Sequence, residues 1–141
     1  MKMTVIYPKW PKLEGQTEFH LPPHGPVVFA ASVPPEVEIS FFDENVEAID
    51  FSRSTDLTAI STMLSSQLPS AFEIAAKYKE IGVPVIFGGI ATMLHAQEVM
   101  EHADSVFLGE VEGRFEDVID DFKRGKLKKV YDYMRNLPDI N

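Results

Sequence analysis

The chain has 141 residues, of which 45% are hydrophobic and 25% charged, a composition typical of one globular domain and not of a disordered or fibrous chain. Its 22 acidic and 13 basic residues give a formal net charge of −9, which argues against a surface that binds nucleic acid or an anionic membrane. It has no cysteine, so the chain itself cannot form disulfides, thiolate metal sites, a cysteine nucleophile or a cysteine-ligated iron–sulfur cluster.

The hydrophobic pattern also bears on location. No apolar run approaches the roughly 18 residues that a membrane-spanning helix needs. The first seven residues are followed by Pro8 and Lys9, without the apolar core and small-residue cleavage site of a signal peptide. We therefore expect a cytoplasmic protein.

Short apolar runs and helical periodicity alternate along the chain. The runs predict strands at 4–7, 37–41, 57–61, 83–87 and 105–108. Helical spacing predicts helices at 70–82, 97–102 and 115–124, and the apolar stretch 27–32 allows only a short helix. Strands alternating with helices over short connections indicate a parallel sheet covered on both faces. The predicted fold class is α/β: a flavodoxin-like (Rossmann-like) doubly wound parallel sheet in three α/β/α layers.

In such folds ligands bind beyond the carboxyl ends of the strands. The segments expected there, 8–26, 43–45, 62–68, 88–93 and 109–113, contain mostly small, neutral and apolar residues and no cluster of Lys or Arg. This lining suits a large, mostly uncharged ligand better than a nucleoside triphosphate. The chain has neither phosphate-binding glycine motif of nucleotide-binding proteins. A receiver-domain function for Asp43 is disfavoured, because no acidic pair follows the first strand to hold magnesium.

Four segments carry a family resemblance by their order and spacing: Phe42–Glu47, Ile60–Met63, Val83–Ile90 and Ala103–Gly113. Together they resemble the cobalamin-binding domain that precedes the catalytic barrel in cobalamin-dependent radical SAM proteins. The resemblance covers residues 1–131. Residues 126–141 are polar and unpatterned, and 132–141 resemble the linker toward a C-terminal radical SAM-like domain that this chain lacks.

The resemblance implies a corrin ring held over the carboxyl edge of the sheet, with its nucleotide tail threaded into the domain. Ser61 and Met63 align with the Ser-x-Leu of this fold, and Gly88 and Gly89 with its Gly-Gly. A further motif, Gly-Glu-x-Glu-Gly, includes Gly109, Glu110 and Gly113. These seven residues are the predicted cofactor-binding set.

The chain departs from the family pattern at two loops. The Asp-x-His-x-x-Gly motif, whose histidine coordinates cobalt in many cobalamin proteins, does not follow the first strand. The loop after Gly89 lacks the histidine that relatives often have there. The sequence therefore assigns no metal ligand, and His20 and His24 in the first long loop remain the histidine candidates.

The resemblance implies a cobalamin-binding module that serves a radical SAM barrel, in the same polypeptide or in trans, for methyl transfer or rearrangement. The iron–sulfur cluster and S-adenosylmethionine would belong to that barrel, since no catalytic machinery is evident in this chain. The alternative is a domain that kept the fold, lost the cofactor and serves as a docking module. A third hypothesis is a binder of flavin or another small ligand. No nucleic-acid or membrane partner is expected.

Overall fold

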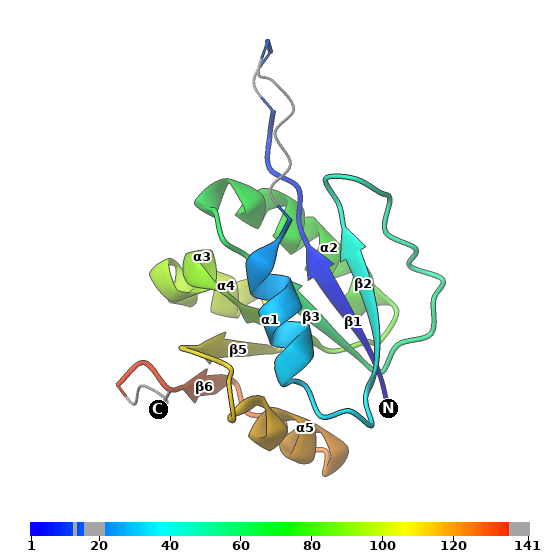
Figure 1. Cartoon of the computed structure of the whole chain (residues 1–141), viewed down its shortest axis with the longest axis vertical. Coiled ribbons are helices and arrows are strands. Elements are labelled where there is room, and N and C mark those ends of the chain that lie inside the picture. Colours follow the sequence, from blue (N-terminus) through cyan, green and yellow to red (C-terminus); the bar gives the residue numbers. More distant parts are fainter. Residues whose placement is uncertain (13, 16–21, 136–141) are drawn as a thin grey trace.

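The structure, a computed structural model, describes residues 1–12, 14, 15 and 22–135 (Figure 1). The strands are β1 (Lys2–Tyr7), β2 (Glu38–Asp43), β3 (Leu57–Ser61), β4 (Val85–Gly88), β5 (Ser105–Leu108) and β6 (Val130–Asp132). The helices are α1 (His24–Ser32), α2 (Leu68–Glu80), α3 (Ile90–Leu94), α4 (Ala96–His102) and α5 (Phe115–Lys123), with a 3₁₀ turn at Ser65–Gln67 before α2.

These six strands form one sheet in the order β2-β1-β3-β4-β5-β6, and every neighbouring pair is parallel. The strand order reverses direction between β1 and β3, which is the switch point where ligands bind in doubly wound folds. The protein therefore has an α/β Rossmann-like fold, as the alternation of strands and helices predicted. The order of the first five strands is that of flavodoxin-like sheets, and β6 extends the β5 edge.

Helices cover both faces of the sheet, and each face has its own core. On one face α2, α3 and α4 pack against the side chains of Ile6, Ile60 and Phe87. On the other face α1 and α5 pack against Val5 and Phe107, and α1 lies in front of the strands in Figure 1. Successive residues of a strand face opposite layers, so a strand buried on both faces is an unbroken apolar run.

Most predicted boundaries agree closely with the structure. Strands β3 and β5 have the predicted bounds, and α2 and α5 lie within two residues of theirs. Pro69 occupies the first turn of α2, and Gly82 follows its end with φ +80°. These are the positions where proline and glycine cost a helix least, since the first turn needs no N–H from Pro and the left-handed residue after the helix needs no Cβ.

Within the tail 126–141, whose sequence predicts no element, residues 130–132 form a short strand, β6. Only Tyr131 in this three-residue strand is buried, so no alternation is readable from the sequence. Residues 136–141 lie outside the described part of the chain. The proposed boundary at 131/132 and a further domain stay predictions.

The connection to β6 has an unusual hand. Helix α5 covers the same face of the sheet as α1, but β6 and β2 are strands at opposite edges of the sheet. The connection from β5 through α5 to β6 is therefore opposite in hand to the other crossovers of this sheet. Those crossovers have the usual right-handed sense. Since β6 pairs in parallel with β5, the chain leaving β6 lies beside the loop that follows β5.

Candidate functional site

A cavity of about 320 Å³ opens at the carboxyl edge of the sheet, between α1, α5 and the ends of β3, β4 and β5. Its wall is largely apolar. The main apolar contributors are Val28, Phe29, Ile86, Phe107, Val111 and Phe115. The volume is at the lower end of the range for small-molecule sites, so it suits one arm of a large ligand or a small ligand.

Three small residues from three elements leave this space open. Ser61 of β3 and Gly88 of β4 are register partners, so their side-chain positions point to the same face of the sheet. Gly25 of α1 lies opposite, and a Cβ placed on it would be 3.9 Å from Ser61 Oγ. A Cβ on Gly88 would meet nothing closer than the Phe107 carbonyl oxygen at 3.8 Å. Larger side chains at these positions would therefore enter the cavity.

Polar groups gather at the rim of the cavity. The lining includes His24 at the start of α1, and Glu110 and Glu112 in the loop after β5. All three are exposed, and Ser61 is the polar residue of the strand wall. The cavity thus offers a hydroxyl inside, hydrogen-bond acceptors at its mouth, and apolar walls between them.

The structure brings five of the seven predicted residues to this cavity: Ser61, Gly88, Gly89, Gly109 and Glu110. Met63 and Gly113 do not line it. The Met63 side chain is 50% exposed, while its backbone N–H donates to Gln67 Oε1 at 2.8 Å. Of the histidine candidates, His24 lines the cavity, and His20 lies outside the described residues.

The backbone at position 89 requires glycine whether or not a ligand binds. Its φ is +101°, and a Cβ there would overlap the carbonyl oxygen of Thr62. The close approach is part of the start of α3, where Ala91 N donates to Thr62 O at 3.2 Å. Because any side chain at Gly89 strains the backbone, a bulky substitution there tests folding before it tests a ligand site.

Sequence reasoning missed the contribution of α1 and α5. Gly25, Val28, Phe29 and Phe115 line the cavity, but nothing in the linear sequence places two helices 90 residues apart on one face. The one signal in the sequence was Gly25, at the start of an otherwise apolar helical stretch. A glycine inside a helix often marks a place where another backbone or a ligand comes close.

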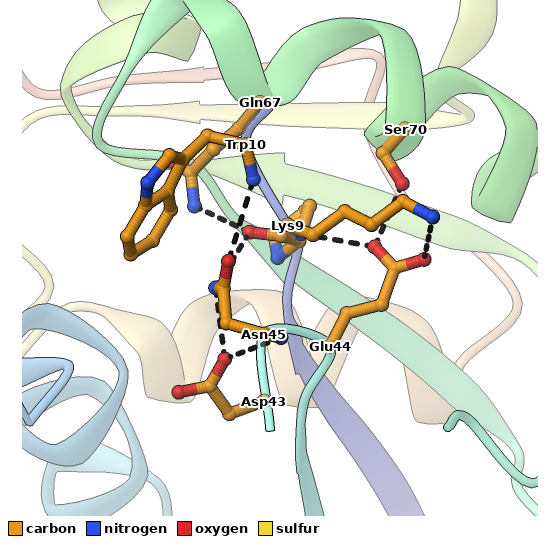
Figure 2. A network of polar contacts seen from close by, with 8 residues as sticks. Lys9, Trp10, Asp43, Glu44, Asn45, Gln67 and Ser70 are labelled. Atoms are coloured by element: carbon orange, nitrogen blue, oxygen red, sulfur yellow. Dashed lines mark hydrogen bonds and ion pairs between the residues drawn. The ribbon is translucent and has the colours of Figure 1, made fainter. Parts of the chain in front are cut away.

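A second group of side chains, at the same carboxyl edge of the sheet, organises the loops after β1, β2 and β3 (Figure 2). The fully buried Gln67 donates to Pro8 O at 2.7 Å and accepts from the N–H groups of Met63 and Leu64. Glu44 accepts from Lys9 N at 2.9 Å and from Ser70 Oγ at 2.7 Å. These groups satisfy one another and serve as a framework for the edge.

Asp43, the residue weighed as a phosphoacceptor, belongs to the same framework. Its Oδ1 accepts from both the backbone and the side-chain nitrogen of Asn45 at 2.9 Å. Asn45 in turn donates to Pro8 O at 3.3 Å. Among residues 1–12, 14, 15 and 22–135, no three His, Asp or Glu side chains gather as they would around a metal ion.

Fold and cavity together define a doubly wound α/β domain with a ligand-sized apolar site at the carboxyl edge. No protein-family model matches the chain, and no solved structure matches it significantly. The helices of the described residues are all too short or too polar to cross a membrane.

Two curated relatives, both from Chlorobaculum tepidum, are similar to this chain. Bacteriochlorophyllide d C-8(2)-methyltransferase is 28% identical over 106 residues, which are 74% of this chain and 23% of that enzyme. Bacteriochlorophyllide d C-12(1)-methyltransferase is 34% identical over 97 residues, 67% of this chain and 21% of that enzyme. The chain is thus related to methyltransferases and spans less than a quarter of their length.

Proposed function

We propose that this domain binds cobalamin and positions the corrin for a radical SAM catalytic domain. The observation that carries the proposal is the apolar cavity kept open by Gly25, Ser61 and Gly88 at the carboxyl edge. Ser61 and Gly88 belong to segments that resemble the cobalamin-binding domain. The space that a Cβ would fill at Gly25 and Gly88 fits a cofactor arm lying against the backbone.

The cavity would hold the nucleotide tail. Its apolar walls suit a flat aromatic base, and Ser61 Oγ would donate a hydrogen bond to an acceptor on the tail. The rim acids Glu110 and Glu112 would accept from amide N–H groups of the corrin periphery. When bound, the cofactor would supply the cobalt chemistry, while the domain supplies position and environment.

The corrin itself is too large for the cavity and would lie above the edge. Apolar side chains are exposed there, after β3 and on α3: Met63, Leu64, Ile90 and Leu94, between 39% and 71% exposed. Exposed apolar side chains grouped beside a cavity are typical of surfaces that a ligand or another domain covers. In this arrangement Met63 contacts the ring and not the tail.

Of the two reaction classes the resemblance left open, we propose methyl transfer. Both relatives are named methyltransferases. The chain has no cysteine, so the cluster and S-adenosylmethionine would be held by a barrel domain in the same polypeptide or in trans. Since the chain spans about a fifth of these enzymes, its substrate is set outside this domain.

The docking-module alternative makes a different prediction about this edge of the sheet. A domain that had lost its cofactor would have a filled or absent tail cavity. The cavity is open, and its three small residues come from separate elements. This supports the binding hypothesis over the docking module.

Filling the cavity tests the proposal. We expect wild type to bind hydroxocobalamin saturably and one to one, and Gly25→Leu and Gly88→Val to bind at least about tenfold more weakly, because overpacking a site costs about 1–3 kcal/mol. Neither glycine has a positive φ, so both substitutions are compatible with the backbone. Absorbance and calorimetric titrations measure the effect, and the spectrum reports whether His20, His24, the cofactor's own base or water binds the cobalt.

Ala31→Leu is the matched control for Gly25→Leu. Ala31 is an exposed residue of the same helix and does not line the cavity, so the wild-type affinity should persist. Undiminished affinity in both filled variants would overturn the proposed tail site. Failure of wild type to bind at high micromolar hydroxocobalamin, alone and with a partner barrel supplied, would overturn cobalamin binding.

A further inference from the structure

The chain that leaves β6 packs directly on the loop that forms one side of the cavity mouth. Tyr133 N donates to Leu108 O at 2.8 Å, which continues the β5–β6 pairing by one step. Gly109 follows with φ +116°, and a Cβ there would lie 3.0 Å from the Tyr133 carbonyl carbon. The loop after β5 thus begins in close backbone contact with Tyr133, and only glycine permits this approach without strain.

The ring of Tyr133 holds the far end of the same loop. Its centroid lies 5.4 Å from that of Phe107, which lines the cavity. The Arg114 guanidinium lies over the ring at 5.1 Å and donates to Tyr133 O at 3.3 Å. Tyr133 Oη donates to Asp117 Oδ2 of α5 at 3.0 Å.

Tyr133 therefore contacts both ends of the segment 109–114 but does not itself line the cavity. Between those ends lie Glu110, Val111 and Glu112, all of which do line it. The segment has other contacts within the domain: Arg114 N and Phe115 N both donate to Val111 O, at 3.1 and 3.3 Å, and the Val111 side chain packs against the core of this face. Tyr133 adds a contact at each end of the segment, so a residue after the last strand helps to set the conformation of the cavity mouth.

We propose that Tyr133 is a positioning residue that holds the loop 109–114 in the conformation that receives a ligand. The consequence for ligand binding rests on the proposed function, because cobalamin is the probe. The effect of Tyr133 on the conformation of the loop is independent of that function. Most of the stabilisation comes from the contacts of the aromatic ring with Phe107 and Arg114. The hydroxyl adds one hydrogen bond to the exposed carboxylate of Asp117.

Two variants separate ring from hydroxyl. Tyr133→Ala should speed amide hydrogen exchange in 109–114 about tenfold in the ligand-free protein, through loss of the two ring contacts. Hydroxocobalamin should dissociate about tenfold faster. Tyr133→Phe keeps both ring contacts and should stay within about twofold of wild type in both measurements. If Tyr133 only stabilised the fold, Tyr133→Ala would lower the unfolding midpoint without a local increase of exchange in 109–114, and Tyr133→Phe would not restore the wild-type exchange rate.

Met134→Ala is the matched control, since Met134 is the next residue and 52% exposed. It should leave both rates at the wild-type values. Unchanged exchange of 109–114 in Tyr133→Ala would overturn the proposal whatever the cofactor does. Faster exchange with an unchanged dissociation rate would overturn the link to the ligand. Faster exchange in a protein whose wild type binds no hydroxocobalamin would support the positioning role and reject the proposed function.

Discussion

Gly88 and Gly89 are neighbours with different physical functions. Gly88 ends β4 with an ordinary φ and leaves space beside Phe107. Gly89 has a left-handed φ and lies against the Thr62 backbone. Read in the sequence, the pair looks like one ligand-binding motif. In the structure, only the first glycine opens the cavity, and the second allows the chain to turn into α3.

We expect Gly89→Ala to lower the free energy of unfolding by about 3 kcal/mol or more, from backbone strain plus the overlap with Thr62. Gly82→Ala is the control, because Gly82 has a φ of +80° but nothing within 4 Å of its Cβ position. That variant should lose only the left-handed cost of about 1 kcal/mol. Urea unfolding measures both. Equal losses would show that the contact with Thr62 contributes nothing.

At the scale of elements, the loops of the carboxyl edge are joined by buried hydrogen bonds. Gln67, in the 3₁₀ turn before α2, links the loop after β1 to the loop after β3 through Pro8, Met63 and Leu64. The neighbouring helix α2 begins directly after this turn. The Gln67 side chain thus fixes how two loops and α2 are placed relative to one another. No local sequence pattern predicts this role.

Gln67→Ala should destabilise the domain by about 2–3 kcal/mol, since it leaves the Pro8 carbonyl and two N–H groups without their partner. It should also speed hydrogen exchange at Met63 and Leu64. The comparison is Ser66→Ala, at an exposed neighbouring position, which should change stability by less than about 0.5 kcal/mol. A loss for Gln67→Ala no larger than that of the control would contradict the bridging role.

At the scale of the whole molecule, buried tyrosines couple stability to alkaline pH. Burial raises the pKa of Tyr78 to about 12, and the charge of Asp50 adds to the effect. The Tyr78 side chain packs in the core between α2 and the sheet and is 1% exposed. The folded state therefore keeps its proton at pH values where the unfolded chain, with a pKa near 10, has lost it.

Because the pKa is higher in the folded state, the stabilisation is complete below pH 10 and declines as pH rises from 10 to 12. We expect the free energy of unfolding to fall by about 2 kcal/mol across this window on account of Tyr78. Tyr78→Phe should show a shallower decline, measured by urea unfolding at pH 8, 10 and 11.5. An identical decline in both proteins would show that Tyr78 does not couple folding to pH.

The sequence alone determined the α/β class, the first five strands and most helix boundaries. These follow from local patterns: a strand covered on both faces is an unbroken apolar run, and Pro69 and Gly82 mark the ends of a helix by their own backbone restrictions. The family resemblance singled out five of the residues that line the cavity, and they gather there because parallel strands end at one edge of the sheet.

Only the tertiary structure decided what those residues do. The cavity exists because Gly25 lies opposite Ser61 and Gly88, which depends on strand register and on how α1 packs. The proposed anchoring of the loop 109–114 depends on β6, which is too short to leave a pattern and whose parallel pairing with β5 brings Tyr133 beside Gly109. Such contacts join residues far apart in the chain, so no local pattern carries them.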